Sequence, residues 1–396
     1  MRPSLEVAQV IEQFLPQIPA QDLTVHQRRT LQAIRACRTA ELGAHIDACD
    51  QCGHLRISYN SCRNRHCPKC QGLNKEMWTI QQEDQLLPTA YFHVVFTLPH
   101  QLNGLCLHNP RFMYNLLLQA AWYTLHTFAS DPKWLGAKTA ATMVLHTWGQ
   151  TLVLHPHVHC IVPNGGLTAD GQWQLPKRGN DRFLYPVEAM KKVFKAFFLK
   201  QLRLVLEQGL LGLPPDFPAS PGTYYRWKED LYQKQWVVFT KKPFAGVQNV
   251  VRYLARYSHR VAITNHRIKH IDQQHVHFEY KDYADQAKKK IMTLAGLTFL
   301  KRFCLHMLPP HFRKVRQYGF LANACKARDI ALARKALGLK NQQLLDRAQR
   351  KVLAKLRLFK LQADQCPCCQ MGKMIIFHIY APNKDPPKFI PQLKTS

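Results

Sequence analysis

The sequence contains no long hydrophobic run. No segment of about 18 residues is both apolar and free of charged side chains, as a helix that crosses a bilayer would be. The N-terminal segment carries Glu6 and Glu12 where a secretory signal peptide has an unbroken apolar stretch. We therefore expect a cytoplasmic protein without a membrane-spanning segment.

Acidic side chains are scarce as well. The 396 residues include 55 Lys and Arg but only 25 Asp and Glu, which gives a formal net charge of +30 at pH 7. A hydrophobic content of 46% supplies a core, so the chain is not a disordered basic tail. A compact protein of this charge repels itself unless it meets a polyanion. Nucleic acid is the first candidate for that partner, and an anionic membrane surface is the second.

The sequence also lacks a glycine-rich phosphate-binding loop, internal repeats and low-complexity tracts. Without such a loop we expect no nucleotide cofactor. The 13 cysteines are odd in number and lie in clusters. In a reducing compartment, clustered cysteines indicate metal ligands rather than disulfides.

Apolar segments with a period of two predict strands, and segments with a helical period predict helices. The predicted strands cover residues 91–98, 139–147, 157–162 and 235–242, with a hairpin formed by strands around Val261 and 276–280. The predicted helices cover residues 4–15, 111–129, 187–210 and 245–258, followed by a basic helical region over 299–360. Because strands and helices do not alternate strictly, the sequence predicts an α+β fold with a central antiparallel sheet flanked by helices.

Two pairs of cysteines predict a zinc site. Each pair has the spacing C-x2-C, which places two sulfur atoms on one tight turn, and two such turns can complete a tetrahedron around zinc. Four protein ligands leave no position for water, so this zinc is expected to be structural. Cys62 or His66 could replace one ligand, and the alternative to zinc is a set of buried thiols. The predicted ligands are Cys49, Cys52, Cys67 and Cys70.

Basic side chains lie between these cysteines, and Arg63 and Arg65 are the candidates for phosphate contacts there. A second group of cysteines stands in the segment CPCCQMGK near the C-terminus. These residues, Cys366, Cys368 and Cys369, supply half of another zinc site. The other half stays open, with Cys304, Cys325, His306 and His311 as candidates.

Three histidines alternate along the segment LHPHVHCIV, at His155, His157 and His159. Alternate residues of a strand share one face, so their imidazoles can reach one metal ion. His155 precedes a proline and is expected to lie outside the regular strand, which leaves His157 and His159 as the stronger pair. If the preceding strand is antiparallel, His146 lies nearly opposite His157 and supplies the third ligand, with Gln150 in reserve. Surface histidines on a loop are the alternative.

Two tyrosines, Tyr253 and Tyr257, stand four residues apart in the predicted helix over 245–258 and are neighbours on its surface. Such a pair commonly serves packing. Beside a metal-bound phosphodiester, however, a phenol can act as a nucleophile. The basic side chains around this pair are Arg252, Arg256 and Arg260. Should these two tyrosines not be used, Tyr283 and Tyr318 are the next candidates.

The region over 299–360 contains 16 Lys and Arg against two Asp. Arg313, Lys314 and Arg316 form its densest cluster, and we expect this region to contact the DNA backbone. A solvated charged face is the alternative interpretation.

These elements, in this order, resemble one family, the two-tyrosine, His-hydrophobe-His transposases of the insertion sequence 91 family. The resemblance extends over most of the chain, roughly from Arg28 to residue 380. The matching segments are CDQCGH…SYNSCRNRHCPKCQ, LHTWGQTLVLHPHVHCIVPNGG, YLARYSHR and LPPHFRKVRQYGFLAN.

The resemblance implies a transposase that cuts and rejoins single-stranded DNA at insertion-sequence ends and targets by rolling-circle transfer, in the bacterial nucleoid. His157 and His159 would bind a divalent metal ion, Mg²⁺ or Mn²⁺. Tyr253 and Tyr257 would form 5′-phosphotyrosine links and leave a free 3′-OH. The zinc segment would help to bind the end of the element.

The implied organisation has three parts. Residues 1–85 form an N-terminal helix and a zinc-binding domain, residues 86–297 form the nuclease and strand-transferase domain, and residues 298–396 form a basic helical region with a small cysteine cluster. The DNA sequence recognised and the oligomeric state stay open.

Two other functions compete with this one. A non-catalytic, zinc-dependent DNA-binding regulator explains the cysteines and the charge but gives the histidines and tyrosines no role. A zinc hydrolase that uses the three histidines needs a carboxylate as general base, and no Asp or Glu lies between Asp131 and Asp170.

Overall fold

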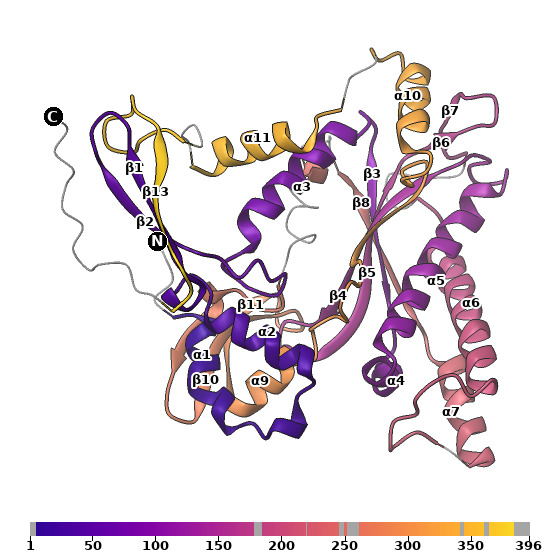
Figure 1. Cartoon of the computed structure of the whole chain (residues 1–396). Helices are drawn as coiled ribbons and strands as arrows, with labels where there is room; N and C mark the ends of the chain where they lie inside the picture. Colours follow the sequence, from indigo (N-terminus) through magenta and orange to yellow (C-terminus); the bar gives the residue numbers. More distant parts are fainter. Residues whose placement is uncertain are drawn as a thin grey trace.

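The computed structural model describes residues 5–177, 184–218, 220–244, 249–251, 261–340, 344–359 and 364–383. Its central element is a five-stranded sheet in the order β12-β4-β5-β3-β8, in which every neighbouring pair is antiparallel (Figure 1). The predicted α+β fold with a central antiparallel sheet is therefore confirmed. The strands are β3 (Tyr91–Thr97), β4 (Ala140–Trp148), β5 (Leu154–Pro163), β8 (Val237–Phe244) and β12 (Val315–Gly319).

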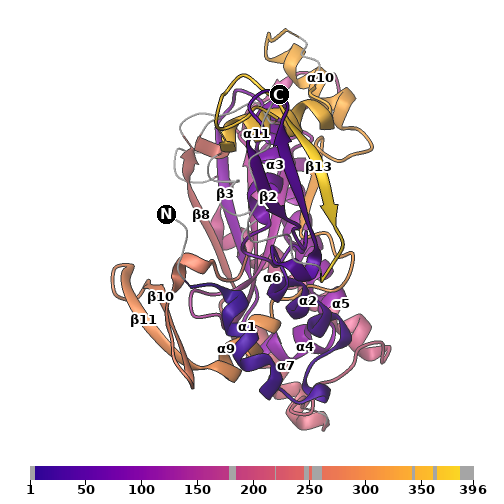
Figure 2. The ribbon, with the colours of Figure 1, turned by 60° about the vertical axis from the view of Figure 1, so that its left-hand side comes forward.

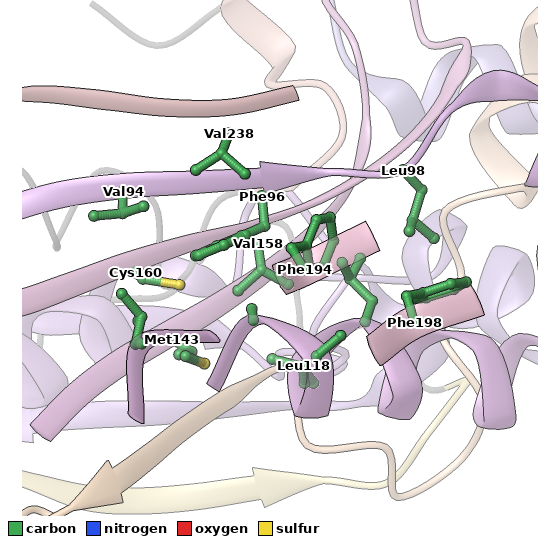
Figure 3. Packing of buried hydrophobic residues seen from close by; sticks show 14 of the residues in the cluster. Val94, Phe96, Leu98, Leu118, Met143, Val158, Cys160, Phe194, Phe198 and Val238 are labelled. Carbon is green, nitrogen blue, oxygen red and sulfur yellow. The ribbon is translucent and has the colours of Figure 1, made fainter. Parts of the chain in front are cut away.

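One face of this sheet is covered by two long helices, α5 (Pro110–Ser130) and α6 (Val187–Glu207). Alternate residues of the strands point into this layer, and Phe96 and Val158 meet Phe194 of α6 there (Figure 3). Burial of each such side chain stabilises the fold by about 1.5–3 kcal/mol. The shorter helices α4 (Asn103–His108) and α7 (Pro221–Gln233) lie at the lower end of this layer in Figure 1.

The other face of the sheet is partly covered by α3 (Gln71–Gln85). Helix α11 (Arg347–Phe359) lies beside α3. Arg357 joins the two helices through ion pairs with Glu76, at 3.3 Å, and with Glu83, at 2.8 Å.

A second core lies below the sheet, where α1 (Val7–Phe14) and α2 (Val25–Arg35) pack against α9 (Gly296–Cys304). The approach of α1 to α9 depends on Gly296, because a Cβ atom there would lie 2.3 Å from the ring of Phe14. A three-stranded sheet in the order β11-β10-β9 completes this unit. Its strands are β9 (Ile268–Ile271), β10 (His275–Asp282) and β11 (Lys288–Ala295).

Another small sheet pairs a strand from the C-terminal part of the chain with two strands from the N-terminal part. Its order is β13-β1-β2, so β13 (Met374–Tyr380) pairs with β1 (Ala44–Cys49), which in turn pairs with β2 (Leu55–Tyr59). Figure 2 shows the two small sheets apart, with β2 and β13 near the top and β10 and β11 at the lower left. The described residues also form β6 (Gly166–Leu167), β7 (Trp173–Gln174), α10 (Lys326–Ala336) and several short 3-10 helices.

Two sequence predictions need correction. The region over 299–360 is not helical throughout, because β12 leaves it to become an edge strand of the main sheet, paired with β4. The hairpin strand expected around Val261 is not found in the described residues from 261 onward. Val261 lies buried before the short helical turn Asn265–Arg267, and β10 pairs with β9 and β11 instead. In β12, backbone pairing with the distant strand β4 overrides the local pattern. The hairpin instead forms a few residues further along the chain, between β9 and β10.

The described part of the chain has no helix that is long and apolar enough to cross a membrane. Of the helix expected over 245–258, residues 249–251 are helical and the rest lies outside the described residues.

Candidate functional site

Three histidines of the main sheet lie together. His146 on β4 is directly opposite His157 on β5, as the sequence predicted. His159 follows on the same face of β5, opposite Val144. Each of the three imidazoles offers a ring nitrogen, and these nitrogens lie within 4.8 Å of one another. This spacing suits the binding of one metal ion by three nitrogens.

The orientation of His157 is fixed by a neighbour. Its Nδ1 atom lies 2.6 Å from the carbonyl oxygen of His155. A carbonyl oxygen can only accept, so Nδ1 of His157 donates and the other ring nitrogen, Nε2, keeps its lone pair when the ring is neutral. His155 lies within β5 rather than outside the strand, but its side chain is exposed and does not belong to the histidine group.

A fourth histidine, His93 on β3, was not found by sequence reasoning. Its Nε2 atom lies 2.9 Å from Nδ1 of His159, and the two rings are stacked with centroids 5.1 Å apart. Burial, with smaller effects of Lys241 and His157, lowers the pKa of His93 to about 3. His93 is therefore neutral at pH 7 and can accept from His159 Nδ1, which would leave Nε2 of His159 for a metal. Its isolated position in a hydrophobic strand gave no signal in the sequence.

Aromatic packing encloses His146. The ring of Trp148 stacks on it at 4.6 Å, and His306 contacts the edge of Trp148. Gln150, the reserve ligand of the sequence analysis, instead donates its amide to the hydroxyl of Tyr283 at 3.4 Å. The geometry thus favours His146 over Gln150 as third ligand. Among the described residues, no carboxylate belongs to this histidine group.

The face that presents the histidines also receives residues 249–251, the described part of the helix predicted over 245–258. Val250 is fully buried in one cluster with Tyr91 of β3 and Ile161 of β5. Ile161 is the next residue after His159 on the same face of the strand. The residues predicted to act here lie outside the described residues. They are Tyr253, Tyr257, Arg252, Arg256 and Arg260.

The two alternative tyrosines occupy other places. Tyr318 of β12 stacks on Trp122 of α5, on the face of the sheet opposite to the histidines. Burial raises the pKa of Tyr318. Tyr283 is 71% exposed, in the turn after β10.

The predicted zinc site is divided in two. The C-x2-C spacing predicted that Cys49 and Cys52 combine with Cys67 and Cys70, but the structure places the two pairs in different clusters. This prediction was therefore wrong about which pairs combine, because the chain folds each pair toward cysteines elsewhere in the sequence. The first cluster comprises Cys37, Cys62, Cys67 and Cys70, and the second comprises Cys49, Cys52, Cys366 and Cys369.

The first cluster has the dimensions of a zinc site. The sulfur of Cys70 lies 3.4 Å from that of Cys37 and 3.6 Å from that of Cys62. Sulfur atoms that bind one zinc ion tetrahedrally at about 2.3 Å lie about 3.8 Å apart. Cys62 is thus a ligand candidate beside Cys67 rather than a replacement for it. Cys37 was missed, since a single upstream cysteine has no spacing signal.

The other candidate ligands lie elsewhere. The Nε2 atom of His66 is buried without a hydrogen-bond partner, and burial lowers the pKa of His66 to about 3. Cys304 is buried in the second core, and Cys325 contacts Lys138 at 3.5 Å. His306 Nε2 donates to the carbonyl of Leu152 at 3.1 Å. None of these, nor the exposed His311, joins a cysteine cluster.

The predicted DNA-contacting residues differ in exposure. Arg63 and Arg313 are exposed. Arg65 instead donates to the carbonyl oxygens of Phe312, Leu308 and Pro309, at 2.5–3.2 Å, and so ties the cysteine segment to the loop before β12. Burial, with repulsion from Arg65, lowers the pKa of Lys314 to about 8.

A groove of about 760 Å³ runs along the edge strand β12, between α3 and α5. Its lining is aromatic and basic, with amide side chains and without any acidic residue. Arg316 lies over the ring of Phe312 at 5.2 Å and donates to the side-chain oxygen of Asn115. The aromatic and arginine residues of the groove are Trp78, Phe312, Tyr318, Arg111, Arg313 and Arg316.

Comparisons with known proteins give these features a context. Residues 140–328 match a family model described as "Putative transposase", and residues 7–98 match one described as "Transposase zinc-binding domain". The chain is 41% identical to "Putative transposase y4qJ" of Sinorhizobium fredii over 97% of both chains. It is 30% identical to "Transposase for insertion sequence element IS801" of Pseudomonas savastanoi, over 74% of this chain and 70% of that one. No solved structure matches.

An antiparallel sheet that presents a histidine trio, together with cysteine clusters, a strongly basic chain and these matches, defines a transposase, an enzyme that acts on DNA. The chain belongs to the insertion sequence 91 family of transposases.

Proposed function

We propose that this transposase nicks and rejoins single-stranded DNA through 5′-phosphotyrosine links, with Tyr253 and Tyr257 as nucleophiles and the histidine trio as metal site. The observation that carries the proposal is the buried cluster that Val250 shares with Tyr91 and Ile161. It anchors the segment just before Tyr253 over the face of the sheet that presents His157 and His159.

The histidine trio fits a divalent cation. Three neutral imidazoles leave coordination positions open, and His93 and the His155 carbonyl orient two of the rings. A bound Mg²⁺ or Mn²⁺ would polarise the scissile phosphate and neutralise charge that develops on it.

The tyrosines would carry out the bond exchange. The phenol, whose ordinary pKa is about 10, loses its proton as its oxygen attacks phosphorus. The bond between phosphorus and the 3′ oxygen breaks, and that oxygen takes up a proton to become the free 3′-OH. Rejoining reverses these events, with a 3′-OH as attacking group and the phenol as leaving group. Because one phosphodiester replaces another, no nucleotide cofactor is required.

The surface around the histidine trio has features that suit the binding of single-stranded DNA. On β8, Phe239 is 50% exposed and lies in the same row across the sheet as Val95 of β3 and His159 of β5. Exposed aromatic rings bind unpaired bases by stacking. The basic aromatic groove beside β12 offers a second such surface, where Arg313 and Arg316 would hold phosphates.

The first cysteine cluster is proposed as a structural zinc site that supports recognition of the element's end. Its four sulfurs fit zinc, and the segment 7–98 matches a zinc-binding family model. Exposed Arg63 lies between two of the ligands and would contact phosphate. An enzyme that binds DNA in this way would be found with the bacterial DNA in the nucleoid.

A covalent-adduct assay tests the proposal. The protein is incubated with 5′- or 3′-labelled single-stranded DNA from the element's ends and Mn²⁺ or Mg²⁺. We expect a denaturation-resistant adduct on the 5′ end of the downstream fragment, and none with EDTA. Tight DNA binding without any adduct would favour the non-catalytic regulator. Hydrolysis products without an adduct would instead favour the zinc hydrolase.

A further inference from the structure

The second cysteine cluster joins two C-x2-C turns from opposite ends of the chain. The sulfur of Cys52 lies 3.6 Å from that of Cys366, although the two residues are 314 positions apart. The sulfur of Cys49 lies 3.7 Å from that of Cys369. These distances are close to the spacing of about 3.8 Å between sulfurs that share one tetrahedral zinc ion. They are far longer than a disulfide bond of about 2.05 Å.

Backbone N–H groups on both turns donate to the sulfurs. The amide nitrogen of Cys52 lies 3.4 Å from Cys49 Sγ, and that of Cys368 lies 3.3 Å from Cys366 Sγ. A third amide, of Gly372, lies 3.3 Å from Cys369 Sγ. Hydrogen bonds of this kind favour the thiolate, the form of cysteine that binds a metal.

The two turns also fit each other closely. A Cβ atom on Gly372 would lie 2.4 Å from Cys49 Sγ, so only glycine allows this approach. Asp50 fixes the pair, because its side chain accepts from the backbone N–H of Lys373 at 2.7 Å and its own N–H donates to the carbonyl of Lys373 at 3.1 Å.

Little hydrophobic burial holds this part of the chain together. Strand β13 is mostly exposed, including Ile375, Phe377 and Ile379, which are 56–68% exposed. Among the described residues, the buried cluster around it contains only Met374 besides cysteines. Apart from the small residues and Ile46 of β1, this sheet buries little apolar surface and needs another source of folding free energy, and a structural metal is one such source.

We propose that Cys49, Cys52, Cys366 and Cys369 form a second zinc site that fastens the C-terminal segment to the N-terminal cysteine domain. Cys366 and Cys369 lie outside both segments that match family models. The site holds β13 against β1 and so keeps α11, which precedes it, beside α3. Helix α3 begins directly after Cys70 of the first cluster. The first site thus holds the start of α3, and the second site holds the segment that follows α11. The proposal does not depend on the nicking chemistry.

Native mass spectrometry of the full-length protein, purified under a non-chelating reductant, tests the site. We expect two zinc ions per chain, and one in each of the variants Cys366→Ser and Cys369→Ser. Cys368→Ser is the matched control, because Cys368 is exposed, lies between the two proposed ligands and does not belong to the cluster. It should keep both ions.

Hydrogen exchange adds a readout that metal counting does not give. In Cys366→Ser, exchange should rise at least tenfold over β13 and β1, while β4 and β5 stay protected as in the wild type. Protected β4 and β5 show that the variant has folded. A zinc count that is the same in the wild type and in Cys366→Ser, or iron in place of zinc, would overturn the proposal. A wild type with one zinc ion that Cys366→Ser loses would instead contradict the first cluster alone.

Discussion

Ile161 of β5 and Val250 share one buried cluster on the face of the sheet that presents His157 and His159. In the sequence, β6, β7, α6, α7 and β8 lie between the histidine strand β5 and the tyrosine segment. This shared cluster, which also contains Tyr91, brings the start of the tyrosine segment to the histidine face of the sheet.

Replacing the histidines should separate cleavage from binding. His157→Ala should lower the rate of DNA nicking by roughly 100-fold or more, because metal assistance contributes several kcal/mol to phosphate chemistry. DNA affinity should change little, since it depends mainly on Lys and Arg. Nicking of labelled oligonucleotides and gel-shift titrations measure the two effects. His155→Ala is the control, because its exposed side chain lies outside the trio.

The third ligand can be assigned by comparing two variants. His146→Ala should weaken metal binding and nicking, whereas Gln150→Ala should leave both within about twofold, given the group that the structure forms. Metal titration of nicking activity distinguishes them. Normal metal dependence in His146→Ala, with a loss in Gln150→Ala, would reverse the assignment.

The tyrosines should act in sequence. Tyr253→Phe and Tyr257→Phe should each stop transposition, while at least one of these variants still nicks DNA and the double variant forms no adduct. Each phenol can hold only one 5′ end at a time, so two successive transfers need both. Peptide mapping of the DNA-linked protein is the direct measurement. A linked peptide outside residues 249–260 would move the assignment to Tyr283 or Tyr318.

DNA affinity should fall steeply with salt. Each lost phosphate contact should reduce the slope of log affinity against log salt by about 0.7 for single-stranded DNA. Arg313→Ala should show such a loss because Arg313 is exposed in the groove beside β12. Arg203→Ala on α6 is the control, since Arg203 lies about half exposed on the helix layer beyond the sheet and pairs with Glu207. Equal slopes of log affinity against log salt in the wild type and in Arg313→Ala would show that Arg313 in the groove does not contact DNA phosphates.

Acid should destabilise the protein through buried histidines. Burial lowers the pKa of His306 to about 4, below its ordinary value of 6.5, so the unfolded chain binds more protons between these values. The protonation of His306 therefore costs no stability above about pH 6.5, and its cost grows as the pH falls toward 4. His306→Gln can keep the hydrogen bonds to Leu152 and Thr147. It should reduce the loss of unfolding free energy at acid pH by up to about 3 kcal/mol. Denaturant unfolding at pH 7 and pH 5 measures the difference.

Removal of a ligand from the first cysteine cluster should unfold that segment locally. Cys67→Ser should lose one zinc ion and weaken DNA binding, because structural zinc contributes on the order of 10 kcal/mol to the folding of small sites. The zinc of the second cluster should stay bound. Hydrogen exchange over residues 37–75 and metal analysis check this, with Cys106→Ser, a buried cysteine outside both clusters, as control.

The sequence by itself determined the features that depend on neighbouring residues. The alternation of His157 and His159 determined their common face, since strand side chains repeat every two residues. The C-x2-C spacing determined which two sulfurs lie on one turn, and the strand and helix periods determined the class of the fold. Even the pairing of His146 with His157 followed, because a short connection joins adjacent antiparallel strands.

Only the tertiary structure decided which distant partners complete each group. Cys49 and Cys52 combine with Cys366 and Cys369 because β13 pairs with β1, and sheet order between remote strands is not encoded in local spacing. His93 reaches His159 through the register of β3 on β5, where a shift of one residue would turn it to the other face. Periodicity fixes what lies on one turn or one face, whereas long-range packing decides which turns and faces meet.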